Sequence, residues 1–324
     1  MKHISIVALV VALIAIAGEA FILATRKDNN DEIYRQAIRN EYKVFAPVLP
    51  DTLMLADERV PLEIFYVREG LDRELSSIMY QQSVTQLIMK RSARYFPVIE
   101  EILKKNGLPE DLKYLCVTES MLTNARSPAK AQGFWQFMEV TAKEYGLEVN
   151  DEVDMRNDVE SSTEAACAFL KKLHDRFGSW SLAAAAYNRG HNGLSKQMEE
   201  QSVDAYYDMH LNSETSRYVY RILAYKIIMQ NPQDFGFTLR HCDLYPPIPY
   251  KTITVSERNI DLFELARRNN CSYKMLRWLN PWITADMLHN RAGNTYTIKL
   301  PINNGTQMAV ITQGKKDTSI VERF

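Results

Sequence analysis

The chain has few of the residues that build metal sites or disulfide frameworks. Its 324 residues include only four cysteines and six histidines. No cysteine pair has metal-binding spacing, and the histidines form neither an HExxH motif nor a cluster. We therefore predict no metal and no organic cofactor, and the pattern argues against a metal hydrolase. Cys116 and Cys167 fall on apolar helix faces, where we expect buried thiols.

The chain also lacks a dominant charge. Acidic and basic residues nearly balance, which leaves a formal net charge of -1. No overall field therefore draws it to nucleic acid, and we expect a monomer that has no nucleic-acid partner. Short basic runs such as Lys171-Lys172 are interpreted as solvated helix faces. A hydrophobic content of 46% is typical of a globular protein.

Long hydrophobic runs are absent except at the N-terminus. The run from Ile4 to Ala17 is short for a bilayer span and typical of an export signal. Ala15-Ile16-Ala17 resembles a cleavage site, whereas the apolar residues from Ala20 to Ala24 favour an uncleaved anchor. Both alternatives predict an exported protein of the periplasm or cell envelope, with a membrane contact through residues 4–24 in the second case.

The periodicity of apolar residues predicts a mainly α fold with a small α+β module. Helices are expected over Pro61–Lys105, Phe134–Gly146, Trp180–Tyr187 and Ser213–Met229, with a further helix opened by a Ser161/Glu164 capping box. Residues 34–57 are expected to wrap loosely on the body. The predicted parts are a signal or anchor (1–26), an N-terminal helical extension (27–92), a catalytic domain (93–242), a proline-rich linker (243–250), a strand-helix-helix-strand module (251–302) and a polar tail (303–324).

Glu119 is the most informative residue of the helical part. Leu112, Leu115 and Leu122 form the apolar stripe of one predicted helix, and Glu119 lies on that stripe. A carboxylate on a buried face loses hydration, so its pKa should rise toward the range of a proton donor at neutral pH. A structural ion pair is the alternative interpretation of an acid in this position.

Several motifs in order extend this observation. Glu119-Ser120 is followed by Ala125-Arg126-Ser127, by Gly133 to Met138, by Ala186 to Gly190, and by Glu214-Thr215 with Tyr218-Val219. Over residues 96–232 the chain resembles the soluble-domain lytic transglycosylases, a lysozyme-like family, and is most similar to their membrane-bound D type. The chain departs from the family pattern at Lys130, Arg189 and His191, which places substrate preference in doubt more than catalysis.

The resemblance implies a function. The family cleaves the β-1,4 bond between N-acetylmuramic acid and N-acetylglucosamine in peptidoglycan without water, and it leaves 1,6-anhydromuramic ends. It implies that Glu119 acts first as acid and then as base. It also implies substrate contacts for six residues: Ser127, Gln136, Met138, Tyr187, Asn188 and Tyr218.

Other neighbours are given structural roles. Trp135 and Phe137 are expected to pack in the core, and Asp154 and Arg156 to form an ion pair. Glu214 is interpreted as ordering a helix start or pairing with Arg217, with a second acid as the alternative.

The C-terminal module resembles a divergent LysM domain through Leu262–Ala266, Leu276–Pro281 and Tyr296–Pro301. The resemblance implies binding of glycans that contain N-acetylglucosamine, and a packing module without a groove is the alternative. Two other functions stay open for the whole chain: a muramidase that uses water on the same fold, and a cell-wall glycan-binding protein with little activity.

Overall fold

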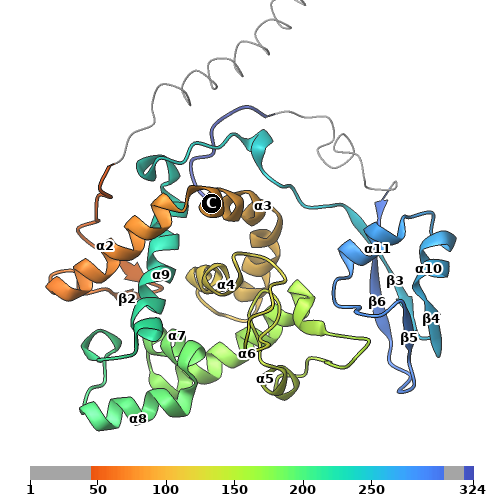
Figure 1. The fold of residues 1–324 in the computed structure, drawn as a ribbon, viewed down its shortest axis with the longest axis horizontal. Helices are drawn as coiled ribbons and strands as arrows, with labels where there is room; N and C mark the ends of the chain where they lie inside the picture. Colours follow the sequence, from red (N-terminus) through yellow and green to blue (C-terminus); the bar gives the residue numbers. More distant parts are fainter. Residues whose placement is uncertain (1–44, 303–316) are drawn as a thin grey trace, which may run out of the picture. The chain divides into compact units, whose positions relative to one another are not determined.

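A computed structural model describes residues 45–302 and 317–324, and it has the predicted mainly α architecture followed by a small α+β module (Figure 1). The predicted signal or anchor at residues 1–26 lies outside the described residues, as does most of the predicted polar tail. Within the described ranges, no helix combines the length and apolar character needed to cross a membrane.

The helical part begins with a short hairpin and continues as a set of packed helices. Its elements are β1 (Met54–Leu55), β2 (Glu58–Arg59), α2 (Phe65–Tyr80), α3 (Gln82–Lys105), α4 (Lys113–Ser120), α5 (Glu139–Glu144), α6 (Val159–Phe177), α7 (Trp180–Arg189), α8 (His191–Gln201) and α9 (Ser213–Gln230).

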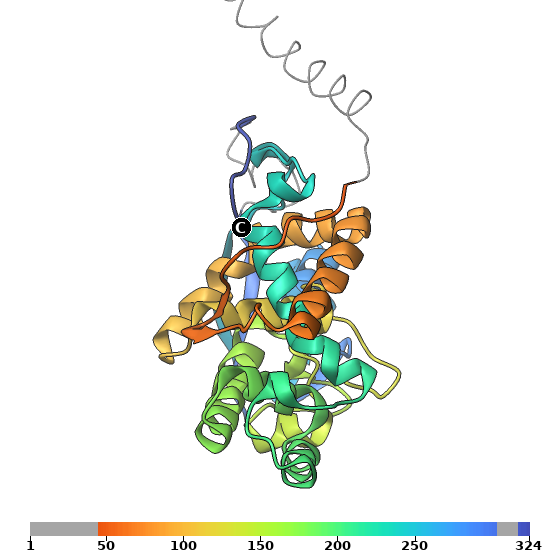
Figure 2. The same ribbon diagram turned by 90° about the vertical axis from the view of Figure 1, so that its left-hand side faces the viewer.

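Helix α4 lies in the middle of this part, where α3 and α9 pack against it (Figure 1). Helix α2 contacts the length of α9, and the same neighbours are visible in orange and teal in the turned view (Figure 2). The apolar stripe of α3 explains its packing, because Ile88, Met89, Phe96, Ile99 and Leu103 recur at helical spacing and are all buried.

The C-terminal module contains two antiparallel strand pairs and two short helices. Its elements are β3 (Tyr250–Val255), β4 (Asn259–Asp261), α10 (Leu262–Arg268), α11 (Tyr273–Leu279), β5 (Met287–His289) and β6 (Tyr296–Pro301). Strand β3 pairs with β6 in the register Val255↔Tyr296, and β4 pairs with β5.

A buried asparagine connects the helices of the module to its sheet. Asn280 is fully buried and makes three hydrogen bonds: its Nδ2 donates to the carbonyls of Leu276 and Lys299, and its Oδ1 accepts from the Lys299 amide. The position explains why an asparagine follows α11, since an apolar residue here would remove the side-chain hydrogen bonds to the Lys299 amide and carbonyl.

Several predictions about individual elements were wrong. The expected helix over 134–146 is reduced to α5, because Gln136 has a positive φ of 49° and residues 133–136 form turns. Helix α6 begins at Val159, two residues before the expected capping box, because the Asp158 carboxylate accepts the Ser161 amide. Residues near 55 do not wrap loosely, since Leu55 in the short hairpin is fully buried.

Other elements were not predicted. Helix α8 was missed, as were β4 and β5 of the module. The end of the predicted polar tail also packs on the helical part: Val321 is buried, and its amide donates to the carbonyl of Leu239. The Phe324 amide donates in the same way to Met229 at the end of α9.

Candidate active site

Glu119 is the penultimate residue of α4. The helix stops there because Met121 and Leu122 adopt left-handed φ angles of 55° and 56°. This ending differs from the predicted continuous helix through Leu122, which lies outside α4 but remains buried. The turn leaves the acid at the helix end, next to the loop that carries the next motif.

Two tyrosines, the buried Tyr218 and the half-buried Tyr187, lie near enough to be influenced by the charge of the carboxyl group. The Tyr218 hydroxyl on α9 donates a short hydrogen bond to Oε1 of Glu119. The Tyr187 hydroxyl on α7 donates to the carbonyl of Trp135 at 2.7 Å. Burial raises the pKa of both phenols well above their ordinary value of 10, and the nearby charge of Glu119 adds to each rise. Both side chains are therefore neutral hydrogen-bond donors at physiological pH.

The environment of Glu119 favours its protonated form. Burial raises the pKa of its carboxyl group from 4.5 to about 7. The hydrogen bond from Tyr218 opposes this rise, whereas the negative charge of Glu214 adds to it. Glu119 has no basic ion-pair partner among the described residues. The structural ion pair that was the alternative interpretation is therefore not seen, and the raised pKa follows the direction expected from the apolar stripe.

The loop after α4 is held in a turn by backbone conformation. Gly133 has a φ of 84°, and a Cβ atom placed there would lie 1.8 Å from the carbonyl oxygen of Arg156. Only glycine fits this close approach. Gln136 uses its Nε2 to donate to the carbonyls of Ala125 and Gly133, both at 2.8 Å. Its side-chain carbonyl remains as an acceptor beside the cavity described below.

A buried ion pair supports the same loop. Asp154 and Arg156 form the predicted pair, with the Arg156 guanidinium 2.7 Å from Oδ2 of Asp154. The guanidinium also donates to the carbonyls of Lys130 and Phe137, at 3.3 and 3.1 Å. Arg156 thereby connects the two ends of the segment that contains Gln136.

Asn188 and Glu214 connect α7 to the start of α9. The Asn188 Oδ1 accepts from the Thr215 hydroxyl at 3.0 Å, and its Nδ2 lies 3.4 Å from Oε1 of Glu214. Glu214 lies in the first turn of α9, as predicted, but the predicted pairing with Arg217 is wrong. Arg217 instead pairs with the buried Glu74 of α2 at 2.6 Å.

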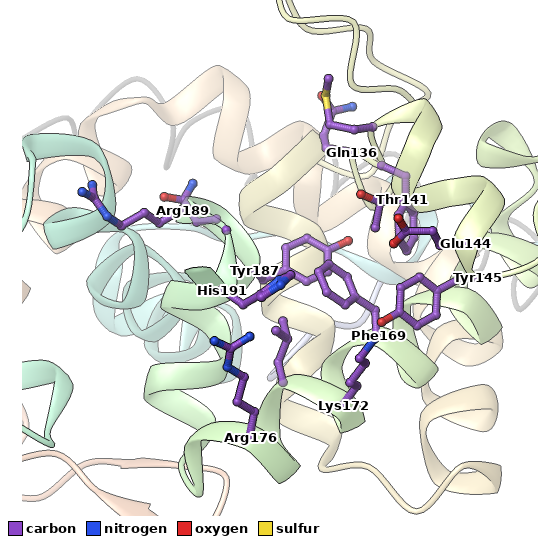
Figure 3. Close-up of a pocket in the computed structure, with 15 residues that line it drawn as sticks. Gln136, Thr141, Glu144, Tyr145, Phe169, Lys172, Arg176, Tyr187, Arg189 and His191 are labelled. Carbon is purple, nitrogen blue, oxygen red and sulfur yellow. The ribbon is translucent and has the colours of Figure 1, made fainter. Parts of the chain in front are cut away.

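A cavity of about 470 Å³ opens between the Gln136 segment, α6 and the α7–α8 junction (Figure 3). Four of the predicted substrate residues line it: Gln136, Met138, Tyr187 and Asn188. Met138 is 46% exposed, as a wall residue should be. Glu119 and Tyr218 do not line this cavity, although the charge of Glu119 influences the pKa of Tyr187, which does line it.

Three residues from the sequence analysis make contacts that stabilise the fold: Ser127, Trp135 and Phe137. The Ser127 Oγ accepts the Ala131 amide at 3.0 Å and closes its own loop, so it is not bonded to Glu119. Trp135 is fully buried and donates to the Thr163 hydroxyl, which confirms its predicted place in the core. Phe137 is also buried, although its ring reaches the cavity wall.

The sequence interpretation missed one wall of the cavity. Phe169, Lys172 and Arg176 lie on one face of α6 and line the cavity, although the Lys171-Lys172 run was interpreted as a solvated face. The spacing of three and four residues was a readable signal that these side chains share a face. What the sequence did not indicate was that this face borders a cavity.

Two family models match the chain. Residues 96–209 match the family model described as Transglycosylase SLT domain, and residues 251–304 match the model described as Soluble lytic transglycosylase C-terminal LysM-like domain. The chain is 33% identical over 184 residues to Membrane-bound lytic murein transglycosylase D of Escherichia coli (strain K12), an alignment that covers 55% of this chain and 40% of that protein.

A second relative is similar over a shorter region. The chain is 37% identical over 113 residues to the Putative tributyltin chloride resistance protein of Alteromonas sp. (strain M-1), which covers 33% of this chain and 54% of that protein. The chain thus spans well under two thirds of the length of these relatives. The matched regions nevertheless include all the predicted site motifs from Glu119 to Asn188. The chain therefore contains a lysozyme-like transglycosylase SLT domain followed by a LysM-like domain, and it is homologous to membrane-bound lytic murein transglycosylase D.

Proposed function

We propose that the protein is a lytic transglycosylase that cleaves the β-1,4 bond between N-acetylmuramic acid and N-acetylglucosamine in peptidoglycan. The observation that carries this proposal is the state of Glu119, a half-buried residue whose desolvated carboxyl group has a pKa raised to about 7. A group with this pKa can give up and regain a proton near neutral pH. The SLT domain match over residues 96–209 supports the assignment of the substrate.

The proposed reaction uses one protein carboxyl group twice. Glu119 protonates the glycosidic oxygen as the bond to the muramyl anomeric carbon breaks. The C6 hydroxyl of the same muramyl residue then bonds to the anomeric carbon and returns its proton to Glu119, which gives a 1,6-anhydro end and consumes no water. Tyr218 holds the carboxyl group through its hydrogen bond to Oε1.

The residues around the cavity are assigned to binding. Gln136, Met138, Tyr187 and Asn188 would contact the sugar rings and N-acetyl groups, since amide and phenol groups both bond sugar hydroxyls. Ser127 and Tyr218 would contribute from the loop and from α9. The catalytic unit is proposed to span residues 93–242, with the module at 251–302 binding glycan.

A hydrolytic muramidase is the alternative that a specific observation favours. Glu214 is exposed and its charge influences Glu119, so it is placed to act as a base for water in a two-carboxylate reaction. Mass spectrometry of products released from purified peptidoglycan distinguishes the two reactions. Muropeptides with 1,6-anhydromuramic ends support the transglycosylase, and reducing muramic ends would establish hydrolysis. No release would favour a glycan-binding protein.

The proposed location is the cell envelope, which follows from the substrate. Export through the N-terminal segment and a membrane contact through residues 4–24 belong to the same proposal, as does a monomeric state. Fractionation of cells, with the protein detected in the membrane or the soluble envelope fraction, tests whether the segment is retained.

A further inference from the structure

The wall of the cavity opposite Gln136 is basic. Lys172 and Arg176 project from α6, and Arg189 and His191 lie where α7 meets α8 (Figure 3). Among the described residues that line the cavity, Glu144 is the only carboxylate. Cationic side chains therefore outnumber acidic ones, although the chain as a whole is nearly neutral.

These cations have no carboxylate partner among the described residues, unlike several other cations of the helical part. Arg176 donates to the Ser195 hydroxyl at 2.9 Å, and Arg189 lies 3.5 Å from the carbonyl of Gly193. Lys172 lies 5.9 Å from the centre of the Tyr145 ring. In the described part of the chain, all of these contacts are neutral. Other cations of the domain, such as Arg156 and Arg217, have carboxylate partners at 2.7 and 2.6 Å.

The same cavity has an aromatic side. Tyr145, Phe169 and Tyr187 form a continuous row, with ring centres 5.1 Å apart in each neighbouring pair. In Figure 3, Lys172 and Arg176 lie on one side of this row, and Gln136 and Thr141 lie on the other. An apolar wall with a cationic rim suits a ligand that carries both carbon surface and carboxylates.

We propose that this basic wall binds the carboxylate-bearing peptide branch of a muramyl residue, so that the protein prefers glycan strands that retain their peptides. The inference rests on the proposed function. The sugar rings and N-acetyl groups of peptidoglycan are neutral. Its negative charge lies on the carboxylates of the peptide branch, or on the lactyl carboxylate of a muramyl residue that carries no peptide. Two of the basic residues, Arg189 and His191, stand at positions where the chain departs from the family pattern.

The spread of the charges favours the peptide over the lactyl carboxylate alone. Lys172 and Arg176 are one helical turn apart on α6, and Arg189 and His191 come from other elements. A cavity of about 470 Å³ is also larger than one carboxylate requires. Several carboxylates on one extended branch match this arrangement better than a single anion.

The test measures binding to the full chain with Glu119→Gln, so that no ligand is cleaved. Calorimetry compares a disaccharide tetrapeptide, the same disaccharide with a free lactyl carboxylate, and neutral chitobiose. Adding K172A and R176A should weaken tetrapeptide binding about tenfold or more and leave chitobiose binding unchanged. Adding K171A and K196A, which replaces exposed lysines outside the cavity lining, should leave tetrapeptide binding unchanged.

Each other outcome overturns the inference. Equal loss of chitobiose binding would mean that the substitutions damage the cavity rather than remove charge recognition. If the substitutions weakened binding of the free-lactyl ligand as much as binding of the tetrapeptide ligand, the wall would be assigned to the lactyl carboxylate and not to the peptide. Equal affinity of the parent chain for all ligands would also overturn it. Because binding is measured without turnover, failure of the proposed function appears separately, as an absence of product from peptidoglycan by the wild-type chain.

Discussion

The helical part and the C-terminal module differ in the solvent exposure of the side chains proposed to act on or bind glycan. In the helical part the proposed acid is desolvated: the buried Tyr218 donates a hydrogen bond to Glu119, and burial raises the pKa of the Glu119 carboxyl group to about 7. In the module the prominent side chains are open to solvent, since Phe263 and Trp278 are each 55% exposed. Proton transfer needs a low-dielectric environment, whereas adsorption to an insoluble polymer needs accessible aromatic surface.

A short segment, Val153 and Asp154, contacts both the helical part and the module. Val153, which belongs to the helical part by sequence, is buried in the core of the module and forms a β-bridge with Ile283. The next residue, Asp154, donates its amide to the carbonyl of Trp282 and pairs with Arg156 through its side chain. The segment that anchors the module therefore also holds the Gln136 loop.

The largest effect should come from the desolvated acid. Glu119→Gln keeps the size and the hydrogen-bonding capacity of the side chain but removes the proton that is transferred. We expect kcat on peptidoglycan to fall by about 10²–10⁴-fold with unchanged circular dichroism. Glu139→Gln, an exposed acid paired with Lys143, serves as the control and should retain full activity. Near-normal turnover by the Glu119 variant would remove Glu119 from the mechanism.

The next effect should come from the segment that joins the two parts. Asp154→Ala leaves the buried Arg156 guanidinium without its carboxylate, which should lower the free energy of unfolding by about 3 kcal/mol. Denaturant unfolding measures this change. The matched control is Glu139→Ala in an exposed ion pair, where we expect less than about 0.5 kcal/mol. Equal effects for both would mean that burial of the pair has no energetic consequence.

A smaller effect should separate adsorption from turnover. Trp278→Ala removes an exposed ring of the module. We therefore expect about three- to tenfold less protein to sediment with insoluble peptidoglycan. Turnover of soluble fragments should not change, because Trp278 does not line the cavity of the helical part. The control is Val140→Ala on α5, which removes an apolar side chain that is 71% exposed. Unchanged sedimentation of the Trp278 variant would count against glycan binding by this face.

The smallest effect concerns pH. Glu119 must be protonated to act, so activity should fall as the pH rises through about 7. Glu214→Gln removes a negative charge that raises this pKa, so the alkaline limb should move to lower pH. Tyr218→Phe removes a hydrogen bond that lowers it, so the limb should move to higher pH. Profiles of kcat/KM against pH for the two variants measure both shifts. If the alkaline limbs of the two variants moved in the same direction, these causes of the Glu119 pKa would be contradicted.

Much of the fold could be predicted because local signals and tertiary packing agree. The stripe of α9 and the two helices of the module are periodic over their whole length, so their bounds follow from the sequence. The helical stretch expected over Pro61–Lys105 is instead divided at Gln81 into α2 and α3. The failures occur where a side chain or loop overrides the pattern. Asp158 caps α6 in place of Ser161, and the positive φ of Gln136 breaks the helix expected there.

The sequence by itself determined that Glu119 lies on an apolar helix face, and the family resemblance implied that the motifs from Ser127 to Tyr218 contribute to one site. Only the tertiary structure decided which groups meet. It brings Tyr218 from α9 to the carboxyl group and turns Ser127 back on its own loop. It also places the exposed side chains of Lys172 and Arg176 at the edge of a cavity. Periodicity specifies which face of a helix is apolar, but the partners across that face depend on how distant segments pack.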